Sequence, residues 1–259
     1  MEIYVDGSNL IHKLWHVCEN VTQVANGMQR QLSAIEREYK PDFLRVALDA
    51  PGGTWRHELV PTYKAQRGKK PEGLQTLLNS AEQLLGDWCT ASVAGHEADD
   101  IIATWCHRAN LSGTQAVIVS ADKDLYQLLR KDLHVILRSF RTSVGKVTQE
   151  DWFNHDAFAT RWAMVPVQWP QYRALVGDKS DNMPGVNSIG ERYAMTLMGR
   201  YLTIEDCVTA IRRFETTGMP QKQERALLAA WDSGEVQRNI RIHTLVKNVP
   251  LPTPEIATT

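Results

Sequence analysis

Short apolar segments that favour β-strands alternate with longer amphipathic patterns along the first half of the chain. The strand candidates are Ile3–Val5, Leu44–Leu48, Ala116–Ser120 and Leu133–Leu137. Helical spacing of apolar residues is found at Met28–Tyr39, Pro71–Leu85, Ala98–Ala109 and Leu125–Leu129. This alternation predicts an α/β fold with a mainly parallel sheet flanked by helices.

From about Ala163 the strand signals stop, and helical patterns follow. They cover Val167–Val176, a stretch through Met195 and Leu197, Thr203–Phe214, and Gln221–Leu245 in pieces. We therefore predict a sheet domain at residues 1–162, a smaller all-α region at 163–250 and an extended, proline-rich tail at 251–259. A capping-box pattern at Thr148–Asp151 predicts one more helix start in the sheet domain.

Composition is that of an ordinary soluble globule, with 43% apolar and 23% charged residues. No apolar run has membrane-spanning length, and no secretory signal pattern opens the sequence. The four cysteines (Cys18, Cys89, Cys106 and Cys207) are widely spaced, which is typical of free thiols in a reducing compartment. We expect a monomeric cytoplasmic protein of a bacterium or a phage-infected cell, without a membrane partner.

An aspartate follows each of three strand candidates: Asp6, Asp49 and Asp122. The carboxyl ends of parallel strands meet at one edge of a sheet, where α/β proteins bind their ligands. A single aspartate after a strand is usually a loop residue or a helix cap. Three in succession predict that the carboxylates converge.

Further acids occur in tight groups. Glu97, Asp99 and Asp100 occupy one four-residue window, and Asp124 follows Asp122. Asp178 and Asp181 are three apart, which puts them on one face of a helical turn. Carboxylates this close raise one another's pKa unless a cation joins them. Because no His/Cys set has zinc spacing, the pattern predicts a hard divalent ion with oxygen ligands.

Two features predict contact with phosphate. The net charge is −1, but without the clustered acids the remainder is basic, as nucleic-acid binding requires. In the basic segment 55–73, Lys64 and Arg67 would share a helix face beside Tyr63, which is suited to stacking on a base. We interpret Lys69 and Lys70 as solvated loop residues. The glycine-bounded hairpin 185–190, between two helices, would expose backbone N–H groups to phosphate.

The run 177–186, Gly-Asp-Lys-Ser-Asp-Asn-Met-Pro-Gly-Val, closely resembles a segment of the 5′-nuclease family. That family includes flap endonucleases, phage 5′–3′ exonucleases and the 5′-nuclease domain of bacterial DNA polymerase I. The acidic strings at 97–100 and 120–129 resemble two more of its motifs, and Tyr63-Lys-Ala-Gln-Arg67 resembles that of its arch. The resemblance implies a PIN-like sheet domain with an arch at 55–85. It also implies a helix–three-turn–helix (helix–hairpin–helix) at 183–199.

The resemblance also implies roles for individual residues. The implied metal ligands are Asp6, Asp49, Glu97, Asp99, Asp100, Asp122, Asp124, Asp178 and Asp181. The first ion would lie near Asp6, Asp49, Glu97, Asp99 and Asp122, the second near Asp124, Asp178 and Asp181, with Asp100 an outer ligand. The implied catalytic residues are Lys64, Arg67, Asp122 and Asp178. The implied DNA-binding residues are Tyr63, Lys64, Arg67, Gly185, Val186, Ser188, Ile189, Gly190 and Arg192.

By the same resemblance, the expected activity is that of a structure-specific 5′ nuclease. Such an enzyme hydrolyses DNA near free 5′ ends or flaps with two Mg²⁺ ions, for which Mn²⁺ substitutes, and leaves 5′-phosphates. A K⁺ ion at the hairpin and a DNA polymerase acting in trans are open possibilities. Ser188 stands where the family's hairpin commonly has glycine. This difference affects the backbone geometry of the hairpin, and with it any K⁺ site formed by the hairpin carbonyls.

Two alternatives remain. A PIN-like ribonuclease would share the acidic sheet edge but usually lacks the arch and the hairpin module. A non-catalytic DNA-junction-binding module would keep the hairpin, and the complete acid set argues against it.

Overall fold

A six-stranded sheet forms the centre of the first domain. The computed structural model describes residues 1–18, 20–86, 88–131, 133–143 and 146–251. The sheet order is β3-β2-β1-β4-β5-β6, and only β6 is antiparallel to its neighbour. The strands are β1 (Glu2–Asp6), β2 (Phe43–Ala47), β3 (Cys89–Ala91), β4 (Ala116–Val119), β5 (His134–Ser143) and β6 (Lys146–Phe153).

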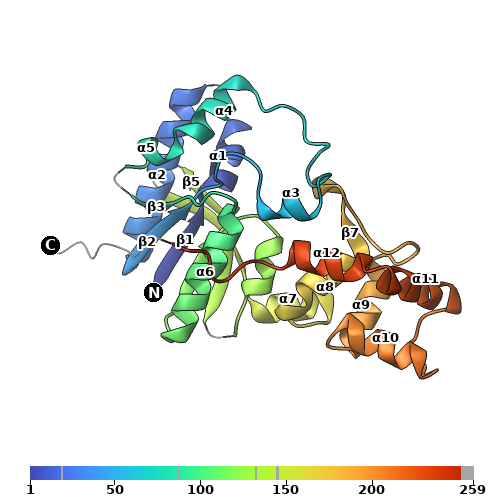
Figure 1. The fold of residues 1–259 in the computed structure, drawn as a ribbon. Coiled ribbons are helices and arrows are strands. Elements are labelled where there is room, and N and C mark those ends of the chain that lie inside the picture. The colour runs from blue at the N-terminus through green and yellow to red at the C-terminus, as the bar shows by residue number, and fades with distance from the viewer. Residues whose placement is uncertain (19, 87, 132, 144–145, 252–259) are drawn as a thin grey trace.

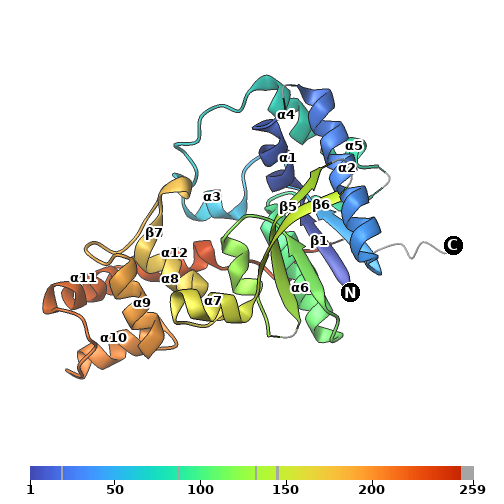
Figure 2. The same cartoon turned by 180° about the vertical axis from the view of Figure 1, so that it is seen from behind.

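Helices cover both faces of this sheet (Figures 1 and 2). The helices of this part of the chain are α1 (Gly7–Trp15), α2 (Val21–Tyr39), α3 (Trp55–Leu59), α4 (Glu72–Asn79), α5 (Ala81–Leu84), α6 (Ala98–Leu111) and the 3₁₀ helix η1 (Asp124–Leu128), of which α3 lies away from the sheet (Figures 1 and 2). Successive strand residues point to opposite faces. Accordingly Ile3 and Val5 pack in the core beneath α1 and α2, while Tyr4 packs in the core beneath α6. The predicted α/β fold with a mainly parallel sheet is confirmed.

The rest of the chain is mostly helical and packs beside the sheet domain (Figure 1). Its elements are α7 (His155–Trp162), η2 (Pro166–Gln168), α8 (Trp169–Val176), β7 (Gly177–Asp178), η3 (Lys179–Asp181), β8 (Met183–Pro184), α9 (Glu191–Arg200), α10 (Ile204–Arg212), α11 (Gln221–Asp232) and α12 (Glu235–His243). None of the described helices combines the length and apolar character needed to span a bilayer.

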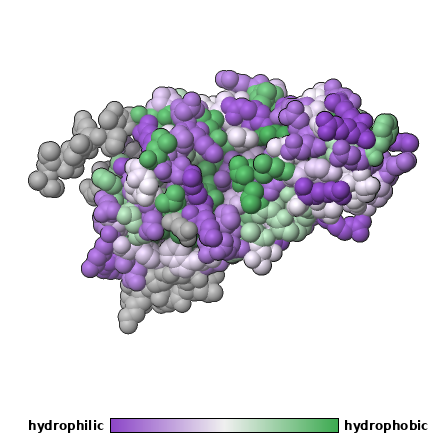
Figure 3. Space-filling view, turned by 90° about the horizontal axis from the view of Figure 1, so that it is seen from below, coloured by the Kyte–Doolittle hydropathy of each residue, from purple (hydrophilic) through white to green (hydrophobic). Residues whose placement is uncertain are grey.

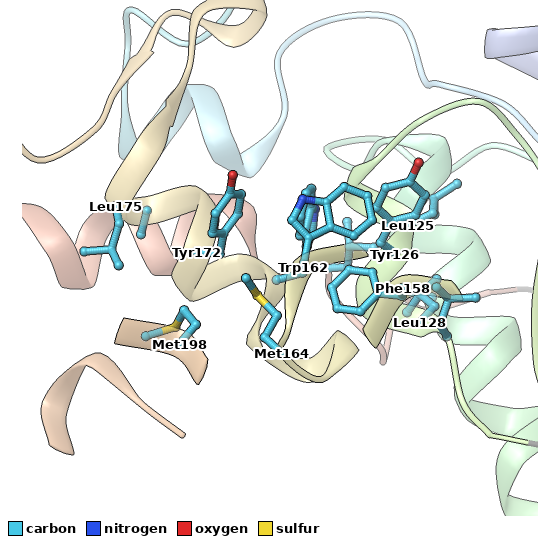
Figure 4. Close-up of a cluster of buried hydrophobic side chains, with 14 of the residues drawn as sticks. Leu125, Tyr126, Leu128, Phe158, Trp162, Met164, Tyr172, Leu175 and Met198 are labelled. Carbon is cyan, nitrogen blue, oxygen red and sulfur yellow. The ribbon is translucent and has the colours of Figure 1, made fainter. Parts of the chain in front are cut away.

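A buried aromatic cluster joins the two parts of the molecule (Figure 4). Tyr126, on η1, lies with its ring centroid 5.3 Å from that of Trp162 and 5.4 Å from that of Trp169. Trp169 in turn stacks on Tyr172, with centroids 5.1 Å apart. Aromatic pairs at these distances add to the stabilisation from area burial. The cluster therefore fixes η1, which begins at Asp124, against the helix that precedes Asp178.

Three predictions about elements were wrong or incomplete. The predicted helix Leu125–Leu129 is a 3₁₀ helix. The backbone of residues 148–151 belongs to β6, and the next helix starts instead at His155. It is capped by Asn154, whose side chain accepts a hydrogen bond from Ala157 N at 2.8 Å. The region after residue 163 is not purely helical, because β7 and β8 form a two-stranded antiparallel ladder. The predicted tail lies outside the described residues from position 252 on.

That ladder depends on two glycines whose backbones nearly touch. A Cβ added to Gly185 would lie 2.4 Å from the carbonyl oxygen of Leu175 and 2.6 Å from Gly177 N. By contrast, a Cβ on Gly190 would meet no heavy atom within 4 Å. Gly185 therefore holds the hairpin to the end of α8, whereas Gly190 leaves open space at the start of α9.

We expect Gly185→Ala to lower the free energy of unfolding by about 1–3 kcal/mol, because the new methyl group overpacks a backbone contact. Gly190→Ala, the matched control, should change it by less than about 0.5 kcal/mol. Chemical denaturation of both variants followed by circular dichroism measures the difference. Equal stability of the two variants would contradict the close approach seen here.

Candidate active site

Three strand ends bring Asp6, Asp49 and Asp122 together at one edge of the sheet. Asp6 caps α1 by accepting from Asn9 N at 2.9 Å, and the Ser120 hydroxyl donates to its second carboxylate oxygen at 2.8 Å. Asp49 accepts from Ala98 N at 2.8 Å, which ties the end of β2 to the start of α6. The same contacts that cap the helices thus orient the acids.

The acids line two adjoining pockets. The first has a volume of about 210 Å³, and its acidic lining consists of Asp6, Asp49, Glu97, Asp99 and Asp122. The second has a volume of about 330 Å³, and its acidic lining consists of Asp122, Asp124, Asp178 and Asp181. Asn9, Arg67 and Asp122 border both. Apart from Asp122, which lines both pockets, the acids fall into the same two groups that the resemblance assigns to two ions, and the ions themselves stay a prediction.

Crowding in the first pocket disfavours full ionisation. Burial, then the charge of Asp49, raises the pKa of Asp6 to about 7. Burial and the neighbouring Asp124 raise the pKa of Asp122 to about 6. Burial and the charges of Asp122 and Asp6 raise the pKa of Asp99 well above its usual range. Such mutual repulsion is relieved when a cation binds between the carboxylates.

Basic side chains already offset the acids of the second pocket. Arg173, on α8, forms an ion pair with Asp178, and its Nε lies 3.5 Å from Asp124. His243, on α12, places Nδ1 3.9 Å from the other oxygen of Asp124. Burial by itself would raise the pKa of Asp124, but His243 and Arg173 outweigh it and lower that pKa to about 2.

The donor set fits hard divalent cations, because it consists of crowded carboxylates without thiolates. In the described residues, however, no three acidic, histidine or cysteine side chains already have the arrangement of a metal site. The ion pairs with Arg173, Lys64 and Arg67 instead hold several of the acids. Metal binding would therefore require these carboxylates to exchange cationic side chains for ions.

Lys64 and Arg67 project from the arch segment into the pockets. The ammonium of Lys64 donates to Glu97 at 2.8 Å, and Arg67 Nη2 donates to Asp181 at 2.6 Å. The predicted shared helix face is wrong. Residues 61–66 form turns, and Lys64 has a left-handed backbone with φ of 56°. Burial opposes the charge of Lys64, but Glu97 and Asp181 outweigh it and raise its pKa.

Tyr63 is not available for stacking on a base. It is 4% exposed, and its ring packs with Met183 and Ile242. Its hydroxyl lies 3.1 Å from an oxygen of Asp181 and 3.3 Å from one of Glu97. Tyr63 therefore anchors the arch between the two acidic motifs, which corrects its predicted role in DNA binding.

Asp100 is the acid that the structure separates from the others. It is fully buried, and Arg56 donates to both of its oxygens, at 2.8 and 2.9 Å. Trp55 Nε1 and the backbone N of Val246 also donate to it. Asp100 lines neither pocket. Its predicted role as an outer metal ligand is replaced by that of a buried ion pair which joins α3, α6 and the C-terminal segment.

Several side chains at the pockets were not predicted. Lys70, interpreted above as a solvated loop residue, lines the first pocket together with Asn9 and His12. Arg173 and His243 contact Asp124 from helices far apart in the sequence. The sequence gave only one indication for Lys70 and Arg173, which is that each lies a few residues from a predicted site residue. His243 gave none.

The hairpin after β8 lies between α8 and α9, as predicted. Val186 and Ile189 are buried, and their N–H groups donate to Leu175 O and Val186 O, so these two residues support the turn rather than offer free amides. Ser188 has a left-handed backbone with φ of 63°. Gly190 precedes α9 and supplies no side-chain cap, and the exposed Glu191 and Arg192 follow in the first turn. Uncapped N–H groups beside a cation form a place for an anion.

Fold and site together define a class of protein. It consists of α/β proteins with an acid-lined, metal-compatible site at the carboxyl edge of a parallel sheet, joined to a helical region with a glycine-bounded hairpin. The chain belongs to the 5′–3′ exonuclease family. Residues 2–162 match the model of its N-terminal resolvase-like domain, and residues 164–258 match that of its C-terminal SAM fold.

Individual relatives agree with this assignment. The chain is 31% identical over 254 residues to the thermostable DNA polymerase I of Thermus aquaticus, covering 92% of this chain but only 29% of that polymerase. Phage T5 5′-exonuclease with bound zinc has the same fold, with a TM-score of 0.75 at 22% identity, over 95% of this chain and 90% of that one. Human GEN1 in complex with Holliday junction DNA is more distant, with a TM-score of 0.60 at 14% identity, over 95% of this chain and 61% of that one.

Proposed function

We propose that this chain is a structure-specific 5′ nuclease that hydrolyses DNA phosphodiester bonds near free 5′ ends or flaps and leaves 5′-phosphates. The observation that carries the proposal is the pair of adjoining acidic pockets that share Asp122 and Arg67 at the sheet edge. Family membership supports the reaction class. The metal-bound T5 5′-exonuclease and the DNA-bound GEN1 support divalent ions and a DNA substrate.

Two Mg²⁺ ions, or Mn²⁺ in their place, would be held by the acids of the first pocket and of the second, with Asp122 between them. When bound, such ions supply an activated water and stabilise the leaving oxygen. Lys64 and Arg67 would exchange Glu97 and Asp181 for the oxygens of the scissile phosphate and so offset its developing charge. Tyr63 keeps the arch segment at the pockets while this exchange occurs.

The open start of α9 and Arg192 would hold the phosphates of the duplex part of the substrate. Because backbone contacts carry no base information, we expect the shape of the DNA rather than its sequence to decide binding. A K⁺ ion at the hairpin carbonyls and a DNA polymerase acting in trans belong to the same proposal. The partnership with a polymerase is supported by the DNA polymerase I sequences to which this chain is similar.

The proposal is tested with labelled flap, nicked, single-stranded and RNA–DNA substrates, each with Mg²⁺ and with excess chelator. We expect cleavage near the 5′ end of the flap in Mg²⁺, no cleavage in chelator, and recovery on adding Mg²⁺ or Mn²⁺. Undiminished cleavage in chelator would exclude a metal mechanism. Tight flap binding without cleavage under any metal condition would indicate a junction-binding module instead.

A further inference from the structure

A third pocket lies away from the acidic edge, between the second half of α6, the end of η1 and the start of the helical region. It has a volume of about 400 Å³, within the usual range for small-molecule sites. None of the acids assigned to the metal pockets lines it. Asp124 begins η1 at the acidic edge, while Leu128, at the other end of η1, lines this third pocket.

The charged part of its lining is basic. Arg130, Lys131 and Lys247 come from two segments more than a hundred residues apart and meet at this pocket, with His107 and His155 beside them. Among the lining residues that the structure describes, none is acidic. Among the described lining residues, no carboxylate pairs with these three cations, and permanent cations without such a partner favour an anion.

The opposite part of the lining is apolar. Val165 and Val167 are 39% and 65% exposed, and Pro166 lies between them. Viewed from below, patches of hydrophobic surface lie among hydrophilic surface near the middle of the molecule (Figure 3). An inorganic anion would leave this apolar wall uncovered. The lining therefore suits an anion that carries a flat or apolar group.

One buried side chain fixes the polarity of the pocket floor. His134 is 4% exposed, and its Nδ1 lies 3.0 Å from the carbonyl oxygen of Leu128, which makes Nδ1 the protonated donor. Burial lowers the pKa of His134, so the ring is neutral near pH 7. Its Nε2 is buried and has no partner among the described residues. A neutral Nε2 accepts hydrogen bonds, and it would repel a phosphate oxygen.

From these features we infer that the pocket binds a phosphate monoester of a nucleoside. The phosphate contacts Arg130, Lys131 and Lys247, and the base covers Val165 and Val167. A hydroxyl or N–H of the nucleoside donates to His134 Nε2. The ligand is either a free mononucleotide or the 5′-phosphorylated end of a short oligonucleotide. This site is separate from the proposed metal centre and does not depend on it.

Isothermal titration calorimetry of the full chain in excess chelator tests the inference with thymidine 5′-monophosphate, a 5′-phosphorylated tetranucleotide, thymidine and inorganic phosphate. We expect saturable binding of the first, the second or both, and binding at least about tenfold weaker for thymidine and for phosphate. Binding of the mononucleotide would identify a free nucleotide as the ligand, and binding of the tetranucleotide would identify a 5′-phosphorylated strand end. Binding of neither phosphorylated probe, or equal affinity for inorganic phosphate, would overturn the inference.

Variants separate this pocket from other basic surfaces. Lys131→Ala and Lys247→Ala change exposed side chains, and each should weaken binding about tenfold, whereas Lys222→Ala, on α11 outside the pocket, should not. His134→Asn keeps a donor for Leu128 O but removes Nε2, and it should weaken nucleotide binding more than phosphate binding. Affinity that is unchanged in both lysine variants would overturn the assignment, whether or not the His134 variant folds.

Discussion

Asp99→Asn is expected to abolish most cleavage while it makes the metal-free protein more stable. Asp99 lies in the first acidic pocket, where burial and the charges of Asp122, Asp6 and Glu97 raise its pKa. An acid whose pKa is raised in the folded state opposes folding when it is ionised, so a neutral side chain of similar size removes that penalty. Loss of one carboxylate from a hard-cation site should slow cleavage by at least about 100-fold.

The measurements are single-turnover flap cleavage in Mg²⁺ and thermal unfolding at neutral pH in excess chelator. We expect a much lower rate and a higher unfolding midpoint than in the unmodified chain. Natural sites commonly sacrifice stability for function in this way. A variant that cleaved at the normal rate would show that Asp99 does not hold the metal, and a lowered midpoint would show that the crowding argument is wrong.

The adjacent Asp100→Asn is the matched control, since it removes the same charge one residue along α6. Asp100 is fully buried against the guanidinium of Arg56, which would be left without its bidentate partner. Breaking one side of a buried ion pair costs about 3–5 kcal/mol, so this variant should unfold at a lower temperature. If both variants shifted the midpoint in the same direction, the different roles of the two acids would be refuted.

The contrast between these neighbours shows what the sequence could predict about the acids. The convergence of Asp6, Asp49 and Asp122 followed from general rules, because parallel strands end at one edge. Asp99 and Asp100 are adjacent on a helix, and about 100° of rotation separates consecutive side chains. One of them faces the pocket, and the other faces Arg56. We treated the four-residue acidic string as one set of ligands. The rotation between neighbouring helix residues could already have predicted that Asp99 and Asp100 face different surroundings.

Other features depend on contacts between distant parts of the chain and could not be read locally. The burial of Tyr63 requires Met183 and Ile242, and the guanidinium of Arg56 also donates to the carbonyl of Ile242 at 3.0 Å. The turn conformation at Lys64 is held by Asp181, whose carbonyl accepts from Lys64 N at 2.9 Å. In isolation, the segment around Tyr63 and Lys64 resembles an ordinary amphipathic turn. Only the C-terminal region decides which of its faces is buried.

The same tertiary contacts sharpen the expectation for the arch. Lys64→Ala should slow flap cleavage by about 10²–10³, the usual cost of removing one group that stabilises transition-state charge. Lys64 lines the first pocket and donates to Glu97 at 2.8 Å, so its ammonium is already held beside the acids. Because this role concerns the reacting phosphate, affinity for flap DNA without divalent metal should change far less than the single-turnover rate. Lys64→Arg keeps a cation at the pocket and should recover part of the rate.

Two other lysines of the same segment provide graded controls. Lys69 is exposed and lines neither acidic pocket, so Lys69→Ala should leave the rate within about twofold. Lys70 lines the first pocket, and Lys70→Ala should therefore have an intermediate effect, contrary to its interpretation from sequence as a solvated loop residue. In Mg²⁺ and at saturating enzyme, we expect Lys69→Ala to cleave fastest, Lys70→Ala more slowly and Lys64→Ala slowest. Equal rates for the three variants would mean that Lys64 contributes only general positive charge. If Lys64→Ala lost as much DNA affinity as cleavage rate, Lys64 would act in substrate binding and not on the reacting phosphate.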